Sequence, residues 1–139
     1  CINVTSLWLT GCTPYPGANA HADFHLRKTG VGGSLDVLPW RHVPEAAPAV
    51  AALRADGWRV IAVEQATGSV PLAAADLAPP VVLIFGHERF GVDDALLELA
   101  DAVVELPVRG VSNSLNVALC ASAVLYAGLP AWERSIGGG

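Results

Sequence analysis

The chain has 139 residues, of which 53% are hydrophobic and 15% charged. This composition excludes a disordered tail and is enough for one domain with a core of its own. The formal net charge of −5 and a sequence pI near 5.2 exclude binding to nucleic acid through a broadly basic surface. Any contact with RNA would have to be local, shaped by the fold, or shared with a partner subunit.

The cysteine pattern and the apolar segments bear on the compartment. Cys1, Cys12 and Cys120 show no zinc-type spacing, which indicates buried or incidental thiols in a reducing compartment. No secretory leader pattern opens the chain, and the longest apolar stretch, Leu115 to Leu129, is too short and too polar to span a bilayer. A cytoplasmic protein without a membrane segment is predicted. Because the chain starts at Cys1 and has no methionine, we expect that an N-terminal piece is missing.

In chain order, the first predicted element is a short buried strand from Val4 to Thr10, which is apolar and β-branched. Turn-forming residues and weak periodicity from Gly11 to Gly33 predict a long loop with a functional role. A short strand is predicted from Leu35 to Trp40. A helix is predicted from Pro44 to Asp56, because proline suits the first helical turn and Gly57 suits the residue after the last.

The middle of the chain alternates strands with helices. Trp58 to Glu64 and the unbroken apolar run from Val81 to Phe85 predict strands, the second of them covered on both faces as in a parallel sheet. A short helix from Asp93 to Ala100, capped by Asp93, and a strand from Ala102 to Leu106 follow. The alternation predicts an α/β fold with a mostly parallel sheet flanked by helices.

The last predicted helix starts near Ser114 and stops at Gly128 and Pro130. Helical spacing places apolar and small residues along one of its faces, which is expected to be core or interface. The residues of this face are Leu115, Ala118, Leu119, Ser122 and Leu125.

Two loops follow predicted strands at the edge where open parallel sheets bind ligands. The first is Gly86 to Gly91 (GHERFG), whose glycines allow close approach to the backbone. The second is Leu106 to Asn116, which ends at the N–H groups of the last helix. The chain contains no GxGxxG, no GK[ST] and no GxSxG string, so dinucleotide, P-loop and serine-hydrolase sites are not indicated. A Rossmann-like nucleotide-binding enzyme stays as a weaker alternative.

The strings LIFGHERFGVDDALLELAD and ELPVRGVSNSLNVALCASAVLYAG resemble the second and third motifs of the SpoU/TrmH family of RNA ribose 2′-O-methyltransferases, a part of the SPOUT class. LWLTGCTPYPG followed by RKTGVGG resembles the N-terminal segment of the same family. The likeness covers nearly the whole chain. It implies one SpoU-type methyltransferase domain over residues 1–139, truncated at its N-terminus relative to the family. It also implies a C-terminal deep trefoil knot, which no periodicity reveals.

The resemblance implies S-adenosyl-L-methionine as the cofactor, bound inside the knot between about Leu83 and Leu125. Apolar walls and backbone groups suit its adenine ring. We expect that a side chain at Gly86 weakens cofactor binding because its Cβ would occupy the cofactor's approach. The residues carried over by motif are Gly86, Leu106 and Leu115 as largely backbone contacts, with Ile84, Val108 and Ser114 lining the pocket.

The implied reaction is methyl transfer to a ribose 2′-hydroxyl of tRNA or rRNA, which needs in-line positioning and help in removing a proton. The family pattern places Glu88, Ser114 and Asn116 at this centre, although each could also be a solvated or helix-capping residue. The family's first motif, with its Asn and catalytic Arg, has no match here. His87 stands where Asn is usual, and Arg89 where Gly is usual. A non-catalytic RNA- or cofactor-binding module of the same fold is therefore the alternative.

The remaining predictions concern partners and metals. The RNA-binding candidates are Arg27, Lys28, Arg89 and Arg109, with ordinary surface charge as the alternative. Family members act as homodimers, so the resemblance implies a homodimer. His21 and His25 have metal-ligand spacing, but without a third ligand they indicate exposed polar residues and no metal site.

Overall fold

The computed structural model describes residues 4–29, 37–108 and 115–136. The chain forms two compact units, essentially Asn3–Ala49 and Val50–Gly139. In the first unit, β1 (Leu7–Thr10) and β2 (Trp40–Val43) pair in parallel. The strand predicted from Val4 is thus confirmed over its second half, but its predicted burial is wrong, because Leu7 is exposed and the other three residues are half-buried. The next strand starts where the predicted one ends.

Helix α1 (Ala20–Thr29) lies within the segment predicted as a loop, so that prediction is wrong over these residues. Asn19 begins the helix, because its Oδ1 accepts a hydrogen bond from the Ala22 amide at 2.9 Å. Ala22 is the buried residue among the described side chains of this helix. The helix therefore lacks the apolar stripe by which a surface helix is usually recognised.

The second unit contains a four-stranded sheet in the order β4-β6-β3-β5, with all neighbours parallel. Its strands are β3 (Arg59–Val63), β4 (Val70–Pro71), β5 (Val81–Phe85) and β6 (Ala102–Glu105). The predicted α/β fold with a mostly parallel sheet is confirmed. The two-residue strand β4 and the 3-10 turn after it, η1 (Leu72–Ala74), carry no sequence pattern and were not predicted.

The central strand β3 explains why the sheet forms here. Val60, Ile61 and Ala62 are fully buried, because β3 has a strand on either side and cover on both faces. Burying one such aliphatic side chain stabilises a fold by roughly 1.5–3 kcal/mol. Two helices flank the strands in sequence, α3 (Ala46–Ala55) and α4 (Asp94–Leu99), both where they were predicted. Asp93 occupies the N-cap position of α4, but its carboxylate accepts no capping hydrogen bond.

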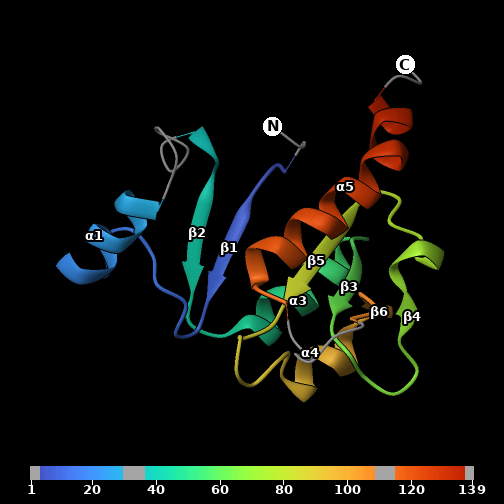
Figure 1. Cartoon of the computed structure of the whole chain (residues 1–139), viewed down its shortest axis with the longest axis horizontal. Helices are drawn as coiled ribbons and strands as arrows, with labels where there is room; N and C mark the ends of the chain where they lie inside the picture. The colour runs from blue at the N-terminus through green and yellow to red at the C-terminus, as the bar shows by residue number, and fades with distance from the viewer. Residues whose placement is uncertain (1–3, 30–36, 109–114, 137–139) are drawn as a thin grey trace. The chain divides into compact units, whose positions relative to one another are not determined.

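Helix α5 (Val117–Ile136) crosses one face of this sheet (Figure 1). It continues through Gly128 and Pro130, so the predicted stop is wrong. The Trp132 ring explains the glycine, because a Cβ on Gly128 would lie 2.7 Å from the ring's Cε2 atom. The Trp132 Nε1 atom donates to the Leu77 carbonyl at 2.7 Å, which ties the last turns of the helix to the core. Among the described residues, no helix is both long and apolar enough to cross a membrane.

The face of α5 that packs on the sheet differs from the predicted one. Val124 is fully buried and packs with Ile61 and Val104 in the core. Leu119, on the predicted apolar face, is 64% exposed, and Leu115 is exposed as well. The expectation that this face is core is wrong for Leu115 and Leu119. The buried hydrophobic side chains of the helix are instead Val124 and Trp132. Its alternative role as an interface stays a prediction.

Candidate functional site

Parallel pairing brings three chain segments to one edge of the sheet in the second unit. Val63 of β3 stands opposite Phe85 of β5 and Val104 of β6, so Glu64, the Gly86–Gly91 loop and Leu106 all follow strands that end together. The ligand-binding edge of a parallel sheet is this carboxyl edge. Four of the predicted cofactor residues, Ile84, Gly86, Leu106 and Val108, lie at or next to it.

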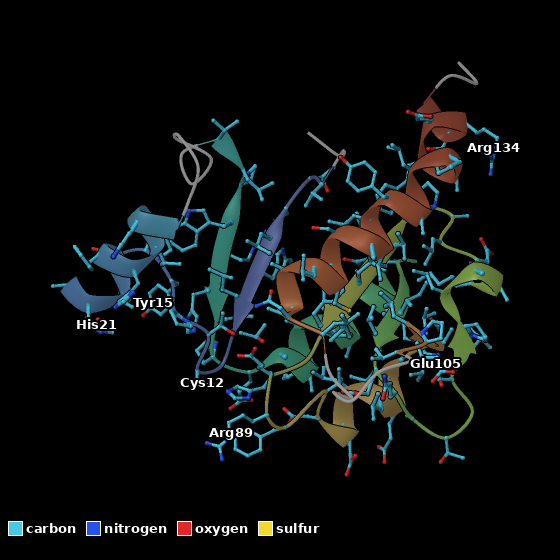
Figure 2. The ribbon with its side chains drawn as sticks, in the orientation of Figure 1. Cys12, Tyr15, His21, Arg89, Glu105 and Arg134 are labelled. Carbon is cyan, nitrogen blue, oxygen red and sulfur yellow. The ribbon has the colours of Figure 1, made fainter. Side chains whose placement is uncertain are left out.

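The loop after β5 is closed on itself by backbone hydrogen bonds. The His87 amide donates to the Gly91 carbonyl, and the Gly91 amide donates to the His87 carbonyl, both at 2.8 Å. Gly91 adopts a φ of +72°, which favours glycine. The turn leaves Glu88, Arg89 and Phe90 exposed at its tip, and Figure 2 shows the Arg89 side chain pointing away from the ribbon.

Glu64, which the sequence analysis missed, anchors this loop. Its half-buried carboxylate accepts hydrogen bonds from the Val92 amide through Oε2 at 3.0 Å and from the Gln65 amide through Oε1 at 2.8 Å. A Cβ on Gly91 would overlap Oε2 of this carboxylate. The available signal was a carboxylate directly after a buried strand at the ligand edge.

Gly86 is enclosed by the same loop. A Cβ built on it would overlap the carbonyl of Gly91 and the amide nitrogen of Val92. A side chain at Gly86 would therefore meet the loop's own backbone first. The sequence predicted that this Cβ would meet the cofactor, but the loop backbone is a nearer obstacle.

The second loop meets the start of α5 at Asn116. The Asn116 Oδ1 atom accepts from the Ala118 amide at 2.9 Å, and its carbonyl accepts from the Cys120 amide at 2.9 Å. Asn116 is thus a helix cap whose amide NH₂ group is not used by that capping bond. Leu115 beside it is 42% exposed. Arg109 and Ser114 lie outside the described residues.

Three of the predicted cofactor residues at this edge carry apolar side chains. Ile84, Leu106 and Val108 are half-buried, and Leu106 packs against the core. Burial, with a smaller effect of the Glu64 charge, raises the pKa of the Cys120 thiol. Cys120 is therefore a neutral thiol and not an activated nucleophile.

The other predicted binding residues belong to the first unit. The Lys28 Nζ atom lies 5.8 Å from the ring centroid of Phe24, while the side chain of Arg27 lies outside the described part of the chain. The Nε2 atoms of His21 and His25 are 3.2 Å apart on α1. No group of three or more metal-ligating side chains occurs among the described residues.

An open hollow of about 480 Å³ also lies in the first unit. Its walls come from the turn after β1 and from α1, and none of them belongs to the two loops at the carboxyl edge. We therefore place the candidate site by the loops and not by this hollow. The lining residues are Gly11, Cys12, Thr13, Pro14, Tyr15, Ala18, Asn19, His21, Ala22, His25 and Leu26.

Comparison with known proteins identifies relatives along most of the chain. The model of the SpoU rRNA methylase family matches residues 3–126. A tRNA (guanosine(18)-2′-O)-methyltransferase of Thermus thermophilus is 30% identical over 95 residues, which are 68% of this chain and 49% of that protein. A 23S rRNA (uridine(2479)-2′-O)-methyltransferase of Streptomyces viridochromogenes is 36% identical over 98 residues, covering 68% of this chain and 34% of that protein.

Solved structures share the fold. The A. aeolicus TrmH/SpoU tRNA modifying enzyme has a TM-score of 0.78 at 22% identity and covers 96% of this chain and 64% of its own. The SpoU methyltransferase AviRb from Streptomyces viridochromogenes, in complex with AdoMet, has a TM-score of 0.75 at 26% identity, with coverages of 98% and 52%. The chain spans half or less of the length of the curated relatives described above. The resemblance of its two loop motifs is confirmed, and the chain belongs to the SpoU rRNA methylase family.

Proposed function

We propose that this protein transfers a methyl group from S-adenosylmethionine to a ribose 2′-hydroxyl of tRNA or rRNA. One observation carries the proposal: the GHERFG loop and Leu106, distant in sequence and both within the part of the chain that matches the family, follow strands that end at the same carboxyl edge of one parallel sheet. The relatives named above are 2′-O-methyltransferases of tRNA and rRNA, and one related structure holds AdoMet.

The residues at this edge fit the proposed cofactor. An adenine ring needs apolar walls and backbone groups, with few charged side chains. Half-buried Ile84, Leu106 and Val108 supply such walls, and Gly86 keeps its backbone free of a side chain. With them we propose Leu115 and Ser114 as cofactor contacts. When bound, S-adenosylmethionine supplies the methyl group that the ribose oxygen receives.

Glu88, Ser114 and Asn116 are the residues that we propose at the reacting centre. Glu88 is exposed at the tip of a loop held by its own backbone bonds, where a carboxylate can accept the hydrogen of a 2′-hydroxyl and orient its oxygen. Asn116 uses Oδ1 to cap α5, so its NH₂ group can donate to the substrate. A rigid helix cap is a suitable base for such positioning.

The RNA is proposed to contact Arg27, Lys28, Arg89 and Arg109. In the structure Lys28 and Arg89 are both exposed, as a phosphate contact requires. With a net charge of −5, few such contacts are expected, and RNA affinity should fall gently with salt, by a slope of about −0.7 for each phosphate neutralised on a single strand.

We further propose a cytoplasmic homodimer with the family's trefoil knot near α5. Leu119 and Tyr126 lie seven residues apart on one side of this helix and leave an apolar surface there, being 64% and 63% exposed. An exposed apolar surface of this kind is typical of an interface. Leu119→Lys would place a charge in it, and sedimentation velocity should then give a monomer. A wild-type chain that sediments as a monomer at high concentration would contradict the homodimer.

The function is tested by titrating the chain with S-adenosylmethionine in a calorimeter. We expect about one site per chain with a dissociation constant on the order of micromolar. Methyl-labelled cofactor is then incubated with bulk tRNA and rRNA, and nuclease digests are searched for 2′-O-methylated nucleosides. Binding without transfer would favour a non-catalytic module of the same fold. Absence of binding at millimolar cofactor would contradict the proposed site.

A further inference from the structure

A cluster of two rings and a guanidinium lies at the tip of the loop that follows β5. The Phe90 side chain is 78% exposed. The His87 ring lies 4.9 Å from it, centroid to centroid, with 30° between the ring planes. The Arg89 Cζ atom lies 5.7 Å from the same ring centroid. A large aromatic ring is thus presented to solvent, with a second ring and a cation beside it.

The protein backbone holds this cluster in place. The reciprocal hydrogen bonds between His87 and Gly91 close the loop, and the Arg89 amide donates to Nδ1 of the His87 ring at 3.0 Å. The amide of Val92, the residue after Gly91, donates to the Glu64 carboxylate. When a ligand binds a loop that is already fixed in this way, little binding free energy is lost in ordering the loop. The exposed ring contributes little to the core, so its packing does not explain its presence.

The chemistry of the cluster suits an unpaired nucleobase. Bases stack on exposed aromatic rings whatever their sequence, since every base has a π face. Arg89 can add a cation–π contact or meet a phosphate. Glu88, Asp93 and Asp94 are exposed close by in sequence, so the surroundings are not a basic track. Stacking is the interaction that can bind RNA in such an acidic setting.

We propose that His87, Arg89 and Phe90 form a platform on which an unpaired base of the RNA substrate stacks. The inference rests on the proposed function, because the platform lies at the tip of the same loop whose first residue, Gly86, we assign to the cofactor. It adds recognition through a base face, which none of the residues proposed above supplies.

The test measures RNA affinity of the full chain by fluorescence anisotropy. The probe is an unstructured, labelled RNA of about 12 nucleotides, within the range of single-strand site sizes. Phe90→Ala should weaken binding about 5- to 150-fold, which is the loss of one stacked base. Phe90→Trp should retain the affinity, whereas Phe90→Leu, apolar without a π face, should lose nearly as much as Phe90→Ala.

Phe24 offers a matched control on α1. It is 62% exposed and has Lys28 near its ring, but its histidine neighbour His25 is edge-on, with 86° between the ring planes. Phe24→Ala should change the RNA affinity less than about twofold. Equal losses at Phe24 and Phe90 would mean that any exposed ring suffices, which contradicts the platform.

Salt dependence and cross-linking provide further readouts. Phe90→Ala should lower the affinity by the same factor at every salt concentration, whereas Arg89→Gln should reduce the salt slope by at most about 0.7. A 5-iodouridine in the same RNA should cross-link to Phe90 or His87 on irradiation, as located by mass spectrometry.

Several results would overturn the platform: unchanged affinity in Phe90→Ala, cross-links only at other residues, or a change in oligomeric state as the sole effect. Calorimetry with S-adenosylmethionine separates the two proposals. Normal cofactor binding with unchanged RNA affinity in Phe90→Ala contradicts the platform alone. If the wild-type chain binds no cofactor and Phe90→Ala still loses RNA affinity, the proposed methyl transfer is contradicted and the platform stands.

Discussion

The two ends of the parallel strands in the second unit use their polar groups differently. At the amino end, polar groups bind one another and the ends of strands. Asp101 accepts from the Val60 amide at 2.8 Å and from the Arg54 Nη2 atom at 2.9 Å, and Arg59 pairs with Asp76 at 2.5 Å. The hydrogen bond from the Val60 amide is the main reason that the pKa of Asp101 lies below its ordinary 3.8.

At the carboxyl end, the Glu64 carboxylate binds loop backbone instead. Glu64 holds the Val92 and Gln65 amides, and the loop that it supports presents Glu88 and Phe90 to solvent. The amino end is therefore expected to determine stability and the carboxyl end to determine binding. Substitutions at the two ends should separate these properties.

Gly86→Val should give the largest effect. Its side chain would overlap the Gly91 carbonyl and the Val92 amide, so the loop must move. Overpacking of this kind costs about 1–3 kcal/mol, which corresponds to a 5- to 150-fold weaker affinity if it is borne by the binding conformation. Calorimetric titration with S-adenosylmethionine checks this. Normal cofactor affinity in Gly86→Val would contradict the site and with it the role of the carboxyl end.

Glu64→Ala should come next. The Val92 amide loses its acceptor, and leaving such a group unsatisfied costs about 1–3 kcal/mol. The substitution releases only the loop from its anchor and leaves the helices and strands in place. Cofactor affinity should therefore fall about tenfold or less, while the far-ultraviolet spectrum stays native. Glu64→Gln is the conservative control, since an amide oxygen can still accept from Val92. If both variants bound the cofactor as the wild type does, Glu64 would be a structural residue only.

The sequence predicted best the elements whose burial follows a simple pattern. β5 is an unbroken apolar run, and its bounds were predicted without error, although it is the edge strand of the sheet and its five residues are half-buried, so the predicted full cover on both faces is wrong. The loops at the carboxyl edge were predicted as well, because the topology of a parallel sheet fixes where they lie. The family resemblance then supplied candidate residues, of which Ile84, Gly86, Leu106 and Val108 lie at or next to this edge.

The failures have physical causes as well. α1 escaped prediction because, among its described side chains, Ala22 alone is buried, and because it begins at the Asn19 cap. α5 passes Gly128 because that glycine makes room for Trp132, a tertiary contact that overrides a local stop signal. Glu64 was missed because its position after an apolar strand marks the ligand edge but does not show that it binds the Val92 amide, 28 residues away in the chain.

Asp101→Asn should lower stability with little effect on cofactor binding. The neutral amide weakens the bond from the Val60 amide and the ion pair with Arg54, and a charged hydrogen bond of this kind is worth about 1–2 kcal/mol. Urea unfolding measures the loss, and titration with S-adenosylmethionine gives the affinity. A loss of cofactor affinity as large as that in Glu64→Ala would remove the distinction between the two ends.

The Asp101 carboxylate also predicts how the stability of the fold changes at acidic pH. Since the pKa of Asp101 is lower in the folded than in the unfolded chain, its contribution is present above about pH 4 and is lost as the pH falls through the folded value. The stability difference between the wild type and Asp101→Asn should therefore shrink below pH 4. A difference that stays constant down to pH 2 would show that the charge of Asp101 is not what stabilises the strand end.

Asp76→Asn should have the smallest effect, although Asp76 also pairs with an arginine at the amino end. The Arg59 hydrogen bond, followed by that of the Ala78 amide, lowers the pKa of Asp76. Its side chain is 67% exposed, compared with 30% for Asp101, so water screens the pair. An asparagine keeps one acceptor oxygen, so it can still accept from either Arg59 or Ala78. Urea midpoints should therefore shift less than in Asp101→Asn, because Asp101 alone of the two holds an amide of the buried strand β3. Equal shifts would mean that the ion pairs, and not the strand-end hydrogen bond, stabilise this end of the sheet.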